Sequence, residues 1–178
     1  MSFDDRLCTA VRGPFAASGA HYDAPYWPTP DSLVNHLLDV AAVGPGERLI
    51  DLGCGDGRIV VAAARRGAEA LGVDIDPERI AEARAAATEA GVAARACFRQ
   101  EDLFVTDLSG ASVVTLYLLP VANRLLGARL RTELAPGSRV VSHAWPIEGW
   151  PADRQEWVDG RVVYSWTVPN RTIAEGSE

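Results

Sequence analysis

Residues 49–58 read LIDLGCGDGR: a short apolar run, a loop with glycine at alternate positions, and a helical pattern that follows at once. The glycines are Gly53, Gly55 and Gly57. Glycine adopts positive φ without strain and lets a ligand approach the backbone closely. We therefore interpret this segment as a strand, a ligand-binding loop and the start of a helix, an arrangement typical of nucleotide-binding α/β proteins.

Apolar runs and helical patterns alternate around this loop. A first helix is expected at roughly 30–43, with Thr29 as its N-cap and Pro30 at its first position. Strands are expected at 48–52, 69–75, 94–100, 113–118 and 138–142, and helices at 57–67, 77–91 and 120–134. This alternation predicts an α/β fold with a doubly wound parallel sheet, covered on both faces.

The end of the chain has a different pattern. Residues 154–158 and 161–169 flank the dipeptide Asp159-Gly160, which favours the type I′ turn of a tight hairpin. The parallel sheet is therefore expected to end in an antiparallel hairpin. Trp150, Trp157 and Trp166 are expected to pack this hairpin onto the sheet. The predicted division is an irregular arm at 1–28 that covers the active site, one domain at 29–170 and a tail at 171–178.

Acidic residues around the glycine loop indicate the kind of ligand. Asp74 ends the second expected strand, 21 residues after Gly53 (74 − 53), where a carboxylate can accept the hydroxyls of a ribose. A dinucleotide site would need a small residue where Arg58 stands, which argues against NAD. Asp51 and Asp56 disfavour phosphates and favour an ammonium or sulfonium group. The ligand predicted from these residues is a cationic, phosphate-free nucleoside.

With these motifs, residues 29–144 resemble the class I, Rossmann-like methyltransferases that depend on S-adenosylmethionine. The resemblance implies S-adenosyl-L-methionine as cofactor, S-adenosyl-L-homocysteine as product, and a sheet of order 3-2-1-4-5-7-6. It further implies that Asp51 and the loop backbone hold the methionine part, Asp74 the ribose and Ile75 the adenine. In QEDLF (100–104), Asp102 would accept from the adenine amino group, with Leu103 nearby. From the residues alone, Asp51 could instead cap the loop, and Asp102 could be an N-cap or turn residue.

A closer resemblance involves PYWPTP (25–30), TLYLLP (115–120) and RVVSHAW (139–145), which are similar to a subgroup related to protein-lysine N-methyltransferases. It implies that Thr29 contacts the cofactor carboxylate and that Tyr26 or Trp27 lines the acceptor channel. The cofactor-binding residues expected from both resemblances are Tyr26, Thr29, Asp51, Gly53, Cys54, Gly55, Asp74, Ile75, Asp102 and Leu103. The stretch 145–154 replaces a helix that many members have, and could form part of a substrate rim.

The acceptor is expected at the end of the fourth strand, where TLYLLP lacks the Asn/Asp-Pro-Pro-Tyr/Phe motif of many enzymes that methylate nucleobases or glutamine. Tyr117 and His143 are the candidate catalytic residues, because aromatic faces attract cations and imidazole can move a proton. Tyr22 and Trp145 are further aromatic candidates. Each has an alternative: Tyr117 could be a core aromatic, and a single histidine at a strand end could be structural.

Composition limits the partners. The 178-residue chain carries 17 Lys+Arg and 24 Asp+Glu, a formal net charge of −7, which disfavours a nucleic-acid partner. It contains no lysine that could act as a base, and no CxxC pair that would suggest a metal site. Without an apolar leader or a run of about 20 apolar residues, a cytoplasmic protein without membrane insertion is expected.

The leading hypothesis is direct in-line methyl transfer to an amine nitrogen, with protein lysine as the first acceptor. The alternatives are a small-molecule N- or O-methyltransferase and a non-catalytic module that binds S-adenosylmethionine.

Overall fold

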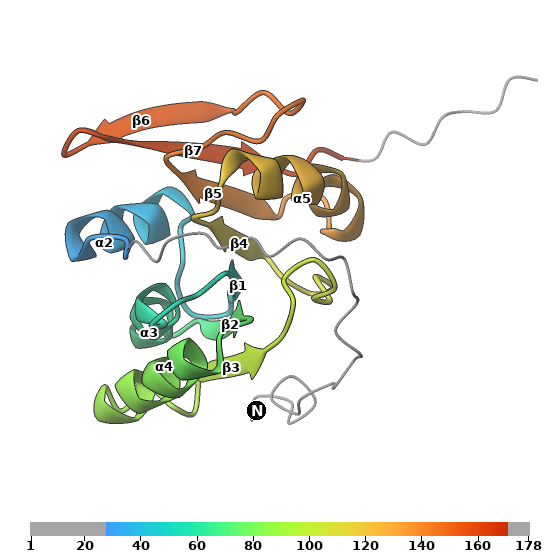
Figure 1. Cartoon of the computed structure of the whole chain (residues 1–178). Helices are drawn as coiled ribbons and strands as arrows, with labels where there is room; N and C mark the ends of the chain where they lie inside the picture. The colour runs from blue at the N-terminus through green and yellow to red at the C-terminus, as the bar shows by residue number, and fades with distance from the viewer. Residues whose placement is uncertain (1–27, 171–178) are drawn as a thin grey trace, which may run out of the picture.

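The computed structural model describes residues 28–170, so that most of the expected arm and all of the expected tail lie outside the described residues (Figure 1). The sheet has seven strands in the order β3-β2-β1-β4-β5-β7-β6. Only β7 runs antiparallel to its neighbours β5 and β6. The predicted fold class and strand order are therefore confirmed.

The elements follow the expected alternation, and most of them are shorter than predicted at one end or both. The strands are β1 (Arg48–Leu52), β2 (Glu69–Asp74), β3 (Ala96–Gln100), β4 (Val113–Leu116), β5 (Arg139–His143), β6 (Arg154–Val158) and β7 (Arg161–Thr167). The helices are α2 (Asp31–Val40), α3 (Arg58–Arg65), α4 (Pro77–Glu89) and α5 (Pro120–Glu133). Between residues 28 and 170, no helix combines the length and apolar character needed to cross a bilayer.

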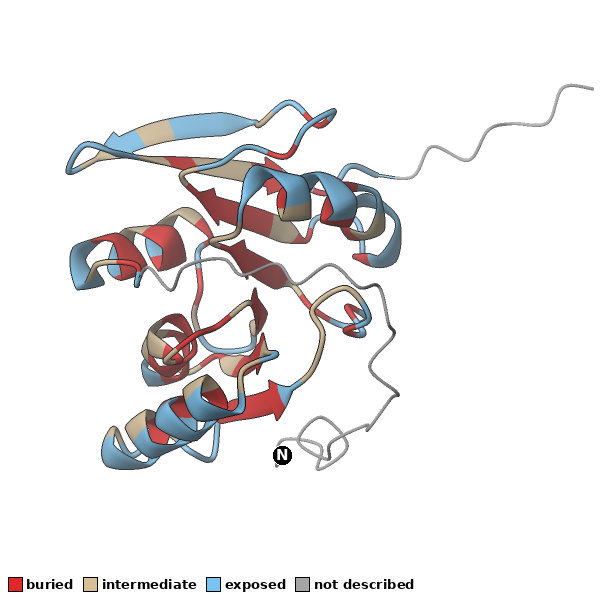
Figure 2. Ribbon diagram, in the orientation of Figure 1, coloured by how far each residue is buried: buried red, intermediate tan, exposed pale blue. Residues whose placement is uncertain are grey.

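Two apolar cores lie on opposite faces of the sheet. Helices α2, α3 and α4 cover one face, whereas α5 and irregular segments cover the other (Figure 1). On β4, Val113 belongs to the first core and Val114 to the second, because successive strand residues point to opposite faces. The central strands are buried on both sides, which explains their nearly continuous apolar runs (Figure 2).

The start of α2 differs from the expectation. Pro30, not Thr29, is the N-cap residue, and no side chain caps the helix. Pro30 has ψ of 147°, outside the helical region, while its carbonyl accepts hydrogen bonds from the amides of Leu33 and Val34. Thr29 is therefore one residue too early to cap α2, and its carbonyl is free for another contact.

The terminal hairpin turns as predicted. Asp159 and Gly160 both have positive φ, 49° and 75°, as a type I′ turn requires. The hairpin also contacts α2: Ser32 Oγ donates a 3.1 Å hydrogen bond to Asp159, and His36 Nε2 lies 3.0 Å from a carboxylate oxygen of Glu156. The last two strands are thus joined to the first described helix.

Residues 144–153, between β5 and β6, form a loop without a helix, as expected for the stretch 145–154. Trp150 and Trp166 pack against each other and are buried, and Trp166 Nε1 donates to the Trp150 carbonyl at 2.8 Å. The expectation for Trp157 was wrong, because 69% of this residue is exposed. Trp157 lies on the edge strand β6, most of which is exposed (Figure 2).

Candidate active site

The candidate site lies at the carboxyl edge of β1, β2, β4 and β5, where ligands of open α/β sheets bind. From this edge β1 continues into the glycine loop and α3. Asp51 is paired in register with Thr115 on β4, so that their side chains point to the same face of the sheet. The site therefore forms where neighbouring parallel strands end together.

The glycine loop has a conformation that side chains would not allow. Gly53, Gly55 and Gly57 have φ of 80°, 52° and 78°. A Cβ on Gly53 would lie 2.8 Å from Leu118 Cδ2, and a Cβ on Gly57 would lie 2.7 Å from Phe98 Cε1. These close approaches and the left-handed backbone together explain the glycines at 53 and 57.

Asp51 is a buried carboxylate without an ion-pair partner among residues 28–170. Its exposed fraction is 3%, and Thr115 Oγ1 donates a 2.7 Å hydrogen bond to Oδ1. Burial raises the pKa of Asp51 to about 7, the nearby carboxylates of Asp74 and Asp56 add to the rise, and the Thr115 bond opposes it. Within residues 28–170 no basic side chain forms an ion pair with Asp51. A ligand ammonium group would supply the missing positive charge.

Asp74 ties the end of β2 to the glycine loop. Its Oδ2 accepts from the Gly55 amide at 2.9 Å, and its Oδ1 accepts from the Asp76 amide at 3.0 Å. Each oxygen retains a further lone pair for a ribose hydroxyl. The next residue, Ile75, is 58% exposed, which is unusual for isoleucine and leaves an apolar surface beside this carboxylate.

Asp102 lies in the loop after β3 and takes part in a turn. Its Oδ1 accepts from the Phe104 amide at 2.9 Å, as the turn alternative predicted, and this bond does not use Oδ2. Leu103 packs against the core on the α5 face, and its Cδ2 lies 3.9 Å from a Cβ built on Gly53. Val105, which was not among the expected site residues, is 60% exposed in the same loop.

The remaining expected cofactor residues are placed as follows. Cys54 directs its side chain into the core, where it touches Gly72, so only its backbone belongs to the loop. Thr29 is 4% exposed, and its carbonyl accepts from Arg58 Nη1 at 2.8 Å. Tyr22, Tyr26 and Trp27 lie outside the described residues.

Tyr117 and His143 come together at the ends of β4 and β5. Their ring centroids are 3.9 Å apart, with an interplanar angle of 33°. Tyr117 follows the last β1–β4 pair, Leu52 with Leu116, and is therefore level with the start of the glycine loop. The sequence did not predict this contact, because the two residues belong to different strands.

His143 is 2% exposed, and its Nδ1 is buried without a hydrogen-bond partner in the described part of the chain. Burial, and to a lesser degree the positive charge of Arg161, lowers the pKa of His143 to about 4. The imidazole is therefore neutral at physiological pH.

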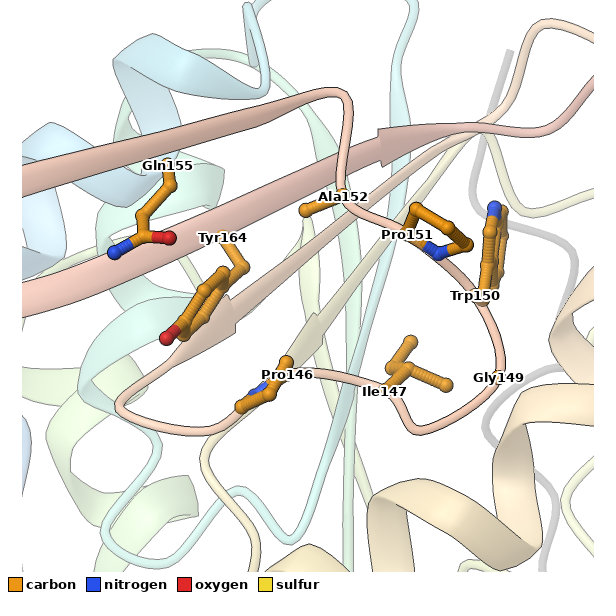
Figure 3. Close-up of a pocket in the computed structure, with 8 residues that line it drawn as sticks. All are labelled: Pro146, Ile147, Gly149, Trp150, Pro151, Ala152, Gln155 and Tyr164. Carbon is orange, nitrogen blue, oxygen red and sulfur yellow. The ribbon is translucent and has the colours of Figure 1, made fainter.

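The loop after β5 is firmly attached to α5. Asn123 Nδ2 donates to the Trp145 carbonyl at 3.0 Å, and Ser142 Oγ donates to the same carbonyl at 2.7 Å. Behind this attachment lies an open hollow of about 500 Å³, shown in Figure 3 and lined by Pro146, Ile147, Gly149, Trp150, Pro151, Ala152, Gln155 and Tyr164. Tyr164 pairs with Ser142 and His143 with Val163, so the hollow and His143 lie on opposite faces of the sheet.

The donor set fits S-adenosylmethionine. The glycine loop, which has no room for side chains at positions 53 and 57, lies beside the buried carboxylate of Asp51. A second carboxylate, Asp74, is suited to a ribose, and the exposed apolar residues Ile75 and Val105 are suited to an adenine. Asp51, Asp56 and Asp74 would repel a pyrophosphate. The site therefore suits a nucleoside that carries an ammonium or sulfonium group better than it suits a dinucleotide.

Comparisons with known proteins agree with this geometry. The sequence pattern of the ANTKMT methyltransferase domain matches residues 51–154. A protein-lysine N-methyltransferase of Saccharolobus islandicus is 45% identical over 150 residues, which are 81% of this chain and 93% of that protein. The mouse adenine nucleotide translocase lysine N-methyltransferase is 34% identical over 86% of this chain and 72% of its own length.

A solved structure extends the comparison. It is described as an RNA methyltransferase from Salinibacter ruber in complex with S-adenosyl-L-homocysteine. It superposes with a TM-score of 0.80 and is 46% identical, covering 85% of this chain and all of that one. The chain described here therefore belongs to the ANTKMT methyltransferase domain family and is an enzyme that uses S-adenosylmethionine.

Proposed function

We propose that this enzyme methylates the side-chain amino group of lysine in an acceptor protein. The observation that carries the proposal is the 45% identity to a protein-lysine N-methyltransferase along 93% of that relative. The mouse relative, also named for lysine N-methylation, supports the same acceptor class. The net charge of −7 favours the approach of a basic acceptor.

Bound at the glycine loop, S-adenosylmethionine supplies an electrophilic methyl group on a sulfonium. Asp51 would hold the ammonium of its methionine part, Asp74 the ribose hydroxyls, and Asp102 Oδ2 the adenine amino group. Ile75 and Leu103 would pack on the adenine. The amides of Gly53 and Cys54 both donate 2.9 Å bonds to the Val73 carbonyl, which keeps the loop in place while a ligand binds.

The acceptor amine must lose one proton to water and present its lone pair in line with the methyl group. We assign this end of the site to Tyr117 and His143. The Tyr117 ring offers its π face to the approaching ammonium. The neutral His143 imidazole packs against this ring and would hold it in place for the amine, while its own Nδ1 is buried. We assign residues 29–170 to the methyltransferase domain.

The test is methylation of a total protein extract with S-adenosylmethionine that carries a labelled methyl group. We expect label in proteins, and methyl-lysine after complete hydrolysis. Because the chain itself contains no lysine, any methyl-lysine must come from the acceptor and not from self-modification.

Two treatments of the same extract are the controls: acetylation of its lysines before the reaction, and digestion with ribonuclease. Acetylation should abolish the label and ribonuclease should not. The opposite result would make RNA the acceptor, as in the description of the Salinibacter ruber structure. Binding of S-adenosylmethionine without label in any fraction would instead indicate a non-catalytic module.

A further inference from the structure

Arg58 is the first residue of α3 and follows the glycine loop directly. Its guanidinium donates two hydrogen bonds to the carboxylate of Asp56, a residue of the loop: Nε lies 3.0 Å from Oδ1, and Nη2 lies 2.5 Å from Oδ2. The Arg58 amide also donates to Asp56 Oδ1 at 3.2 Å. Paired bonds of this kind fix both distance and orientation, which a single point charge does not do.

The remaining end of the same guanidinium reaches a second segment. Nη1 donates a 2.8 Å hydrogen bond to the Thr29 carbonyl and lies 3.7 Å from a carboxylate oxygen of Asp31. Thr29 and Asp31 belong to the segment that enters α2. One side chain therefore joins the glycine loop, the start of α3 and the entry to α2.

We propose that Arg58 is a positioning residue for the cofactor, which sets the spacing between the glycine loop and the segment entering α2 through Asp56 and the Thr29 carbonyl. It does not need to touch the cofactor. The inference rests on the assignment of the glycine loop as the cofactor site in the proposed function, and it does not depend on which acceptor is methylated.

The chemistry of the contact explains why arginine stands here. A planar guanidinium can bind a carboxylate with two nitrogens and a carbonyl with the third, whereas a lysine ammonium cannot match this fork. The ion pair also offsets the charge of Asp56, which otherwise adds to the repulsion at Asp51. Loss of Arg58 should therefore change both the conformation of the glycine loop and the charge around it.

The opposite end of the same helix provides a matched control. Arg66, the C-cap of α3, donates from Nη1 to Asp39 Oδ1 at 2.6 Å and from Nη2 to the Asn35 carbonyl at 3.1 Å. It thus ties α3 to α2 through one carboxylate and one carbonyl, as Arg58 does for the entry segment. The difference is that Arg66 has no contact with the glycine loop among these bonds.

The experiment compares Arg58→Gln, Arg66→Gln and the wild-type full chain by calorimetric titration with S-adenosylmethionine, well below the melting temperature of each. Thermal unfolding without cofactor measures stability in parallel. We expect both variants to lose a similar amount of stability. Arg58→Gln should bind about tenfold or more weakly, while Arg66→Gln should stay within about twofold of wild type.

Two further variants test the route through Asp56. Asp56→Asn should weaken binding, and adding it to Arg58→Gln should cost less than the sum of the single effects, because both changes remove one contact. Arg58→Lys keeps the charge and should recover only part of the affinity. If Arg58→Gln does not fold, Arg58→Lys takes its place in the comparison with Arg66→Gln.

Wild-type affinity in Arg58→Gln or Arg58→Lys, or an equal loss in Arg66→Gln, would overturn the proposal. Failure of the wild-type protein to bind S-adenosylmethionine would instead overturn the assignment of the loop, which is a distinguishable result.

Discussion

Thr115 Oγ1 lies 2.7 Å from Oδ1 of Asp51 and donates to it across the β1–β4 pair. Both residues are almost fully buried. This bond favours the charged form of a carboxylate that burial pushes toward the neutral form. The hydroxyl therefore helps to keep Asp51 ionised near neutral pH, the state in which it can bind an ammonium group.

Replacing Thr115 by valine should weaken cofactor binding at pH 7 by about tenfold, because the pKa of Asp51 rises further when the hydrogen bond is lost. Calorimetric titration with S-adenosylmethionine at pH 7 and at pH 8.5 measures the effect. Affinity should recover in part at the higher pH, where Asp51 ionises again. Thr115→Ser keeps the hydroxyl and is the control; equal affinity in the valine variant at pH 7 would refute this role.

The stability of the cofactor-free protein should depend on the protonation of Asp51. The pKa of Asp51 is 3.8 in its ordinary state and about 7 in the folded protein. Between these two pH values, Asp51 is ionised in the unfolded chain but still protonated in the folded protein. Its contribution to the free energy of unfolding is therefore largest below pH 3.8 and is lost as the pH rises toward 7. The Asp51→Asn variant has no such proton.

The free energy of unfolding, measured with urea across this range, should therefore shift in favour of Asp51→Asn as pH rises. The total shift should be of the order of a few kcal/mol. Glu89→Gln, which changes an exposed carboxylate on α4, should show no comparable trend. A constant difference between Asp51→Asn and wild type at all pH values would contradict the raised pKa.

Asp74→Ala should weaken binding of both S-adenosylmethionine and S-adenosylhomocysteine by about 1.5 to 3 kcal/mol, because it removes the proposed ribose acceptor and frees the Gly55 amide. Asp107→Ala is a suitable comparison: Asp107 also accepts from a backbone amide in a loop, that of Ser109 at 2.8 Å. The second variant should bind normally. Similar losses in the two variants would point to a general loosening of loops.

Gly57→Ala should lower the free energy of unfolding by about 3 kcal/mol, since the new methyl group would meet Ala83 and Phe98 at a left-handed residue. Gly91 also has positive φ, 69°, but open space around a Cβ. Gly91→Ala should therefore cost only about 1 kcal/mol. Urea denaturation of the two variants separates steric overlap from backbone strain, and equal costs would show that the overlap relaxes.

Tyr117→Ala and His143→Phe should reduce methyl transfer about tenfold or more while S-adenosylmethionine binds with unchanged affinity. The turnover assay uses the acceptor that the labelling experiment identifies. Because the pKa of His143 is lowered to about 4, the wild-type rate should show no histidine inflection between about pH 5.5 and 8. Such an inflection, if absent in His143→Phe, would mean that this imidazole titrates normally.

Periodicity in the sequence predicted the fold well, because the apolar runs of this sheet are buried on both faces. The ranges 48–52 and 154–158 match β1 and β6 residue for residue. Local chemistry also predicted the turn at Asp159 and Gly160. The N-cap of α2 was misplaced by one residue, since the backbone angle of Pro30 is not visible in the residue types.

The contacts that shape the site could not be predicted in the same way. Thr115 and Asp51 are 64 residues apart, and Arg58 and Thr29 are 29 apart. Such pairs depend on strand register and helix packing, which cannot be read from the order of residue types in one sequence. A polar residue in the apolar run 113–118 was a signal for Thr115. The exposure of Trp157 depends on what covers β6, which is a property of the whole fold.

The contact between α2 and the terminal hairpin has a consequence for the order in which the molecule is built. Ser32 and Asp159 are 127 residues apart, so α2 has left the ribosome long before its partner strands are made. The same helix begins at the segment that Arg58 holds against the glycine loop. During synthesis, the contact of Arg58 with this segment can form once α3 has been made, whereas the contact of α2 with the hairpin forms only after residue 159 has emerged.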